Sequence, residues 1–256
     1  MKTLPLDGQL AAVLPHLDFG AVEALTPGVW RGFLKGLAAT STTTPLASVH
    51  DVELAAPGNA LRARVYRAVI EPQPTVVFFH GGGWVGGDLD THDELARRLA
   101  IDLRCALVSV EYRRPPEAPY PAPWNDAIEA TRFVAAHQRQ FGGEGQPLAV
   151  CGDSAGANLA AAAAIAARDE GLQLAGQLLL CPVTDLGGGL ADGRFPSRRD
   201  FASGYFISTE LLRWCALQAV PVSRWADPTN SVLRAASLRG VAPAVIATAP
   251  ARPPPT

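Results

Sequence analysis

A serine between glycines is the first group in this sequence that could do nucleophilic chemistry. Residues 152–156 read GDSAG; they follow the apolar run 148–151 and precede an Ala-rich stretch at 158–167. A serine on a tight turn between a strand and a helix keeps its hydroxyl accessible, and flanking glycines let the two backbones approach. The pattern predicts Ser154 as a nucleophile, with the N–H of Ala155 facing the oxyanion that forms on attack. The alternative is a structural turn that only opens a helix.

A second glycine-rich motif follows an earlier apolar run. Residues 80–84 read HGGGW, directly after the run at 75–79. Consecutive glycines remove every Cβ from a backbone that must point N–H groups at a ligand. A phosphate-binding loop does not fit, because no GK[ST] follows and the only lysines are Lys2 and Lys35. The motif, which begins with His80 and Gly81, predicts the second half of an oxyanion hole; a loop without a function is the alternative.

Strands and helices have to position these two motifs. Short apolar runs without alternation are typical of central strands covered on both faces, and they occur at residues 75–79, 106–110, 148–151, 178–181 and 244–248. Helical patterns separate them, and Thr91 with Glu94 has the spacing of a capping box that opens the first helix. Before them, two alternating segments on either side of Pro57 predict a hairpin with one solvent-facing side. The class is therefore α/β, with a mostly parallel sheet flanked by helices.

Composition and charge exclude several classes of protein. The chain has 256 residues, 48% of them hydrophobic, so it can bury a core without a metal or disulfides. Its 22 basic and 24 acidic residues give a net charge of −2, which argues against nucleic-acid and polybasic membrane binding. It has neither a signal-peptide pattern nor an apolar run near the ~20 residues of a membrane span. We expect a cytoplasmic protein with four buried thiols, at Cys105, Cys151, Cys181 and Cys215.

The two motifs, in this order, resemble those of the hormone-sensitive-lipase family of α/β-hydrolases, the bacterial GDSAG-type carboxylesterases. Further similar segments are GDLDTHD at 87–93, VEYR at 110–113, PEAPYPA at 116–122, PVTD at 182–185, GYF at 204–206 and DP at 227–228. The resemblance implies an α/β-hydrolase fold in one domain, with residues 1–47 and 185–225 forming a cap. It implies hydrolysis of short- to medium-chain carboxylic esters through a Ser154 acyl-enzyme, with Gly82, Gly83 and Ala155 as oxyanion-hole donors.

The same resemblance implies which partners to expect. The family's chemistry needs no cofactor and no metal, and the partner is a small-molecule ester. Members of the family often form homodimers through the edges of their sheets. We expect no nucleic-acid partner and no membrane partner.

The sequence departs from this family toward its C-terminal end. The family's triad runs Ser, Asp, His in chain order, with the Asp just after the strand that corresponds to residues 241–248. Here no Asp or Glu follows Asp227, no histidine follows His137, and residues 249–256 read APARPPPT. We expect a truncation or frameshift that removed the last strands and helices. The alternatives are a C-terminal end that was chosen on purpose and a divergent protein that is naturally short. Val245 and Ile246 are then expected to be exposed.

Another base for Ser154 is hard to find in the sequence. His16, His50, His80, His92 and His137 are all expected to be structural or exposed, and both lysines are N-terminal. Without the triad's Asp and His, we expect very weak esterase activity from this chain. The alternative function is a non-catalytic small-molecule binder on a hydrolase fold.

Overall fold

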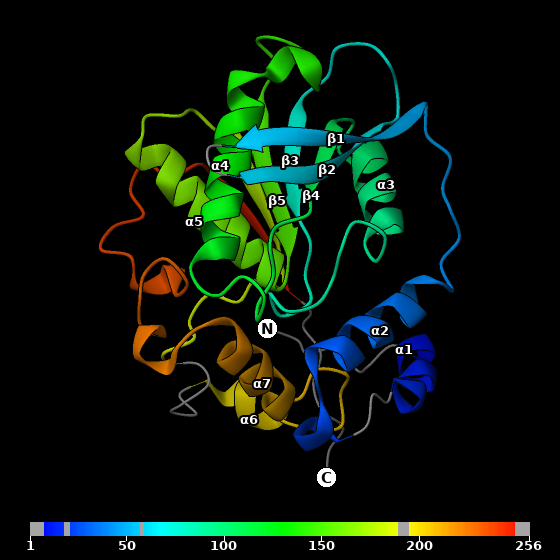
Figure 1. The fold of residues 1–256 in the computed structure, drawn as a ribbon, viewed down its shortest axis with the longest axis vertical. Coiled ribbons are helices and arrows are strands. Elements are labelled where there is room, and N and C mark those ends of the chain that lie inside the picture. Colours follow the sequence, from blue (N-terminus) through cyan, green and yellow to red (C-terminus); the bar gives the residue numbers. More distant parts are fainter. Residues whose placement is uncertain (1–7, 18–20, 57–58, 189–194, 249–256) are drawn as a thin grey trace.

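A mixed sheet organises the computed structural model, which describes residues 8–17, 21–56, 59–188 and 195–248 (Figure 1). Within these ranges seven strands pair in the order β1-β2-β4-β3-β5-β6-β7. The β1–β2 and β2–β4 pairs are antiparallel, and all later pairs are parallel. The strands are β1 (Ser48–Ala56), β2 (Asn59–Arg67), β3 (Thr75–Phe79), β4 (Ala106–Val110), β5 (Leu148–Asp153), β6 (Gly176–Leu180) and β7 (Ala244–Ala247). The predicted mostly parallel α/β class is confirmed.

Helices cover both faces of this sheet because its central strands are apolar on both sides. Val77 and Phe79 of β3 pack into the cluster that includes α4 (Ala122–Ala136) and α5 (Ala155–Asp169). Val76 and Phe78 point the other way, toward α3 (Asp93–Asp102). This alternation is the period of two that a strand imposes on its side chains. Figure 1 shows α3 on one side of the sheet and α4 and α5 on the other.

The hairpin predicted around Pro57 is present. β1 and β2 pair from Ser48–Arg67 to Ala56–Asn59, and residues 57–58 of its turn lie outside the described residues. Leu54 and Leu61 are buried, whereas Glu53 and Arg62 are exposed, so one side faces solvent as expected.

A second group of helices lies below the sheet in Figure 1. It contains α1 (Gly8–Val13), α2 (Pro27–Ala38), α6 (Pro196–Asp200) and α7 (Thr209–Ala219). These helices come from two segments of the chain, one with α1 and α2 and the other with α6 and α7. Leu25 and Trp30 of the first segment pack with Leu211 and Cys215 of the second. The ring centroids of Phe206 and Trp30 lie 6.3 Å apart, so two segments separated by 176 residues share one apolar cluster. Short 3₁₀ turns complete the fold, at Leu14–His16, Val22–Ala24, Gln138–Gln140, Val222–Arg224 and Val232–Arg234.

Two local expectations are wrong. The helix α3 begins at Asp93 with no side-chain cap: the Thr91 hydroxyl instead accepts the N–H of Asp88 at 2.7 Å. The Glu94 carboxylate accepts the N–H and hydroxyl of Thr44, so Thr91 is bound by a residue 3 positions away and Glu94 by one 50 positions away. The second wrong expectation is that all four cysteines are buried. Cys181 is exposed because it follows β6 and lies beside β7, whose residues are exposed.

That strand, β7, is where one expectation fails and another is confirmed. It pairs with β6, but all four of its residues are exposed rather than covered like a central strand. Val245 and Ile246 are 66% and 57% exposed, as expected for a strand at the edge of the sheet. The tail that follows, residues 249–256, lies outside the described residues.

No helix in the described ranges is both long and apolar enough to cross a membrane. The cytoplasmic location stays a prediction.

Candidate active site

Ser154 occupies a strained turn between β5 and α5. Its backbone has φ 53° and ψ −116°, a conformation that costs a non-glycine residue about 1–3 kcal/mol. The turn is held by three backbone hydrogen bonds. The N–H of Ser154 donates to the carbonyl of Leu180 at 2.7 Å, and the Ser154 carbonyl accepts from the N–H groups of Asn158 at 3.2 Å and Val183 at 3.4 Å. Strain of this kind persists only where the surrounding structure enforces it, and it is typical of functional residues.

The two flanking glycines are required by close backbone contacts. A Cβ on Gly152 would lie 2.3 Å from the carbonyl carbon of Gly156. A Cβ on Gly156 would lie 1.9 Å from the carbonyl oxygen of Phe79, at the end of β3. The glycines therefore bring the serine turn directly against the strand that leads into the second motif.

That motif, residues 80–84, turns sharply in front of Ser154. Gly82 and Gly83 have φ values of 112° and 67°. The carbonyl of Gly82 accepts hydrogen bonds from Trp30 Nε1 at 3.0 Å and from the N–H of Gly86 at 2.9 Å. Since C=O and N–H point in opposite directions across a trans peptide, the N–H of Gly83 is turned away from these donors.

Three backbone donors around the serine have no hydrogen-bond acceptor within the described residues. They belong to Gly82, Gly83 and Ala155, the positions predicted to form an oxyanion hole. Ala155 begins α5, where the first N–H groups of a helix lack intrahelical partners. Their role in catalysis stays a prediction, but the groups are free to bind an anionic oxygen.

His80 is fully buried under this loop. Its ring stacks on Tyr112 with centroids 4.3 Å apart, and the Tyr112 hydroxyl donates to the His80 carbonyl at 2.8 Å. Its Nδ1 lies 2.9 Å from the carbonyl of Gly81. Burial, together with the nearby His92, lowers the pKa of His80 to about 3. The ring is a neutral support for the loop, in agreement with the structural role expected for it.

Asp153 links the two motifs, a role that the sequence analysis missed. Its Oδ1 accepts the N–H of Gly81 at 2.9 Å and lies 3.5 Å from His92 Nε2. The carboxylate next to the serine thus fixes the loop that carries Gly82 and Gly83. The only signal in the sequence was an acid inside the GDSAG motif, whose partner lies 72 residues away.

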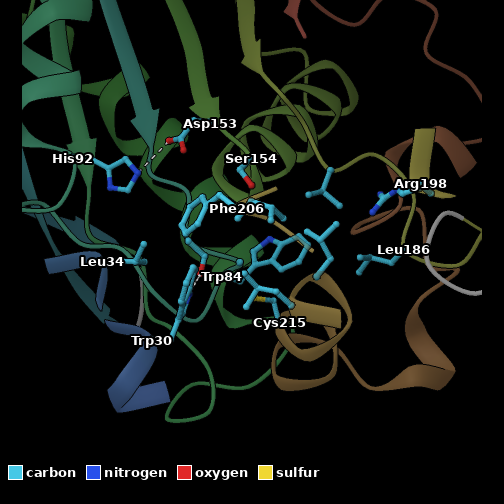
Figure 2. Close-up of a pocket in the computed structure, with 16 residues that line it drawn as sticks. Trp30, Leu34, Trp84, His92, Asp153, Ser154, Leu186, Arg198, Phe206 and Cys215 are labelled. Atoms are coloured by element: carbon cyan, nitrogen blue, oxygen red, sulfur yellow. Dashed lines mark hydrogen bonds and ion pairs between the residues drawn. The ribbon is translucent and has the colours of Figure 1, made fainter. Parts of the chain in front are cut away.

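Ser154 lines a cavity of about 320 Å³ (Figure 2). The cavity lies between the carboxyl end of β5 and the helices α2, α6 and α7. This volume is at the lower end for small-molecule sites. Gly82, Gly83 and Trp84 form one wall with Ser154. The remaining lining is mostly apolar. Val183 comes from the loop after β6, and the others come from the two helical segments below the sheet: Trp30, Leu34, Leu186, Phe206, Ile207, Leu211, Leu212 and Cys215.

The polar side chains of the cavity are few. His92, expected to be structural or exposed, lines it instead, and so do Asp153 and Arg198. His92 is placed there by α3, whose N-terminal end approaches the Ser154 turn. Neither Asp153 nor Arg198 was singled out from the sequence.

No side chain in the described part of the chain forms a hydrogen bond with Ser154 Oγ. His92 contacts Asp153 and Thr91, and His137 contacts the carbonyl of Phe133. His16 and His50 are exposed. Nor do the described ranges hold a cluster of three or more His, Cys, Asp or Glu side chains suited to a metal ion.

Comparison with known proteins agrees with this geometry. The chain is 40% identical over 181 residues to Esterase LipI of Mycobacterium tuberculosis, covering 67% of this chain and 55% of that protein. It is 34% identical over 197 residues to the ethyl acetate hydrolase of Pseudomonas putida, covering 74% of this chain and 60% of that protein. The chain therefore spans a little over half the length of these curated relatives.

Solved structures show the same fold. The hyperthermophilic esterase from the archaeon Pyrobaculum calidifontis superposes with a TM-score of 0.87 at 31% identity, covering 95% of this chain and 79% of that one. A thermostable esterase from Pseudomonas putida gives 0.86 at 33% identity, covering 96% and 79%. The sequence profile of the alpha/beta hydrolase fold matches residues 76–253. The chain belongs to the α/β-hydrolase family, and to the hormone-sensitive-lipase type within it.

Proposed function

We propose that this protein is a carboxylic ester hydrolase that acts on short- to medium-chain esters through a Ser154 acyl-enzyme. The observation that carries the proposal is the cavity in which Ser154 faces a loop with unpaired backbone donors. Relatives of this chain are named as esterases, including an ethyl acetate hydrolase. Residues 1–47 and 185–225 act as the cap, since both supply apolar lining to the cavity.

In the proposed reaction, Ser154 Oγ attacks the ester carbonyl carbon while its proton passes to a base. The carbonyl oxygen becomes an oxyanion, which the N–H groups of Gly82, Gly83 and Ala155 stabilise. Collapse of this intermediate expels the alcohol, which takes up the proton. Water then cleaves the acyl-enzyme by the same route and releases the acid.

We further propose that this 256-residue chain hydrolyses esters only weakly, because no described side chain is placed to take the Ser154 proton. In other serine hydrolases, loss of the triad leaves about 10³–10⁴-fold catalysis over water, from the oxyanion hole and binding alone. A small external base can then substitute for the missing group. Imidazole added to the assay should therefore accelerate hydrolysis that depends on Ser154.

The test compares the purified chain with Ser154→Ala, using p-nitrophenyl butyrate and increasing imidazole. We expect an imidazole-dependent rate above the buffer background in the unmodified chain and none in Ser154→Ala. Equal rates for the two proteins would contradict the nucleophilic role of Ser154. If neither protein hydrolyses the ester but both bind it, the non-catalytic binder is the correct function. Fast turnover without imidazole that Ser154→Ala abolishes would contradict only the proposed weakness.

We also propose that two copies pair through β7, the last strand of the described sheet. Its exposed Val245 and Ile246 and its outer edge favour pairing with an identical strand around a two-fold axis. Ile246→Lys should shift gel filtration toward the monomer, because a lysine on an edge strand opposes pairing. The control is Ile70→Lys, at an equally exposed apolar residue outside the strands. A monomeric unmodified protein at high concentration would refute the pairing.

A further inference from the structure

One charged side chain stands out in the otherwise apolar far side of the cavity. Arg198, on the short helix α6, lines the same cavity as Ser154. In the view of Figure 2, Ser154 lies between His92 on one side and Arg198 on the other. Apart from Arg198, His92, Asp153 and Ser154, the side chains that line the cavity are apolar, among them Leu186, Phe206 and Ile207.

The guanidinium of Arg198 has no acceptor of its own in the ranges that the structure describes. Its backbone carbonyl accepts from the Thr209 hydroxyl, but no hydrogen bond or ion pair involves its side chain. The carboxylate that favours its charged form, Asp185, is itself bound by Arg234 at 2.9 Å and by the N–H of Gly188 at 3.0 Å. The next residue, Arg199, is exposed and pairs with Asp200 at 3.3 Å.

Arg198 is half-buried at the cavity wall, so its charge is only partly solvated and an anionic ligand in the cavity can pair with it. Burial lowers the pKa of Arg198, which reports that the charged form loses solvation there. A guanidinium nevertheless keeps its proton at neutral pH, so the charge persists. Its planar fork of N–H donors fits a carboxylate, and such charge-assisted pairs are about twice as strong as neutral hydrogen bonds.

The two ends of the cavity carry opposite charges. The Asp153 carboxylate lies beside Ser154, and the Arg198 cation lies away from it across apolar residues. At the serine end a free carboxylate would meet the Asp153 carboxylate and only backbone N–H donors, whereas at the Arg198 end it meets a cationic side chain. A substrate with an ester at one end and a carboxylate at the other matches this arrangement, with a short apolar chain between them.

We propose that the site takes half-esters of dicarboxylic acids, and that Arg198 binds their free carboxylate while the ester carbonyl lies at Ser154. This inference rests on the proposed function only in assuming that the cavity holds an ester. Arg198 is then a specificity-determining residue. It selects anionic esters over neutral ones of the same length.

The test measures binding, not turnover, so that it is independent of the proposed catalysis. Ser154→Ala protein is titrated with the monomethyl esters of succinic, adipic and suberic acid. Binding is followed by intrinsic tryptophan fluorescence, since two of the five tryptophans, Trp30 and Trp84, are in the cavity wall. Each half-ester is compared with its terminal amide, which has the same shape without the charge. We expect at least one half-ester to bind ~10–100-fold more tightly than its amide, the gain typical of a charge-assisted hydrogen bond.

Three second-site variants locate the effect. Arg198→Gln should remove the preference for the half-ester, and Arg198→Lys should keep part of it because the positive charge remains. Arg199→Gln, next to it on α6 but paired with Asp200, should leave the preference unchanged. Amide and half-ester binding equally well to the unmodified cavity would overturn the proposal, and so would an Arg198→Gln protein that keeps the preference. Failure of ester hydrolysis with the preference intact would reject the proposed function and leave this inference standing.

Discussion

Gly156→Ala is expected to destabilise the protein by about 3 kcal/mol or more, at the upper end for an overpacked site. The added Cβ would lie 1.9 Å from the Phe79 carbonyl oxygen and 2.5 Å from the His80 carbonyl oxygen. Both are backbone atoms of β3 and the loop after it, so no side-chain rotation relieves the contact. The strand and α5 have to separate, which also moves Ser154 away from Gly83. For a chain of this size the loss corresponds to a melting temperature lower by ~6–12 °C.

The matched control is Gly32→Ala. Gly32 is an exposed residue within α2, and a Cβ there meets nothing within 4 Å. Alanine is favoured over glycine inside a helix by about 0.5–1 kcal/mol, so this variant should melt slightly higher than the unmodified protein. Thermal unfolding followed by circular dichroism measures both changes. If Gly156→Ala melts within a degree or two of the unmodified protein, the close approach of β3 and α5 is wrong.

The features that could be predicted from the sequence are those formed by residues close together in the chain. A strand, a glycine-flanked serine and a helix are contiguous, so the Ser154 turn could be recognised from residues 148–167 alone. The glycine loop after β3 could be recognised for the same reason. The mostly parallel character of the sheet could be predicted as well, since uninterrupted apolar runs separated by helices favour a parallel sheet.

Most of the errors and omissions arise where a residue far away in the sequence makes the deciding contact. Thr91 and Glu94 have the spacing of a capping box, but Asp88 and Thr44 bind them instead, and the contact of Glu94 with Thr44 crosses 50 residues. The link from Asp153 to Gly81 and the position of Arg198 in the cavity likewise depend on how separate segments pack. No periodicity or local motif encodes such contacts.

Lowering the pH is expected to reduce the free energy of unfolding, because His80 is buried and uncharged in the folded protein. In an unfolded chain a histidine has a pKa of about 6.5, whereas burial and the neighbouring His92 lower the pKa of His80 in the folded protein to about 3. Below pH 6.5 the unfolded chain therefore binds a proton that the folded protein does not. Stability is lost as the pH falls, and between pH 7.5 and 5.0 the loss from this one residue is about 2 kcal/mol.

This window isolates the histidine from the carboxylates. Asp88 and Asp93 have lowered pKa values in the folded protein, but unfolded carboxyls titrate near pH 4, so their contribution begins below pH 5. Denaturant unfolding at pH 7.5, 6.5, 5.8 and 5.0 measures the slope. His80→Gln has no titrating group there, so its slope should be shallower even if its stability is lower throughout. The carbon-bound ring protons of His80 should also keep one NMR shift down to pH 4.5. A His80 resonance that titrates near pH 6.5 would mean that water reaches the ring, and that the Gly81–Gly83 loop is not packed over it as the structure has it.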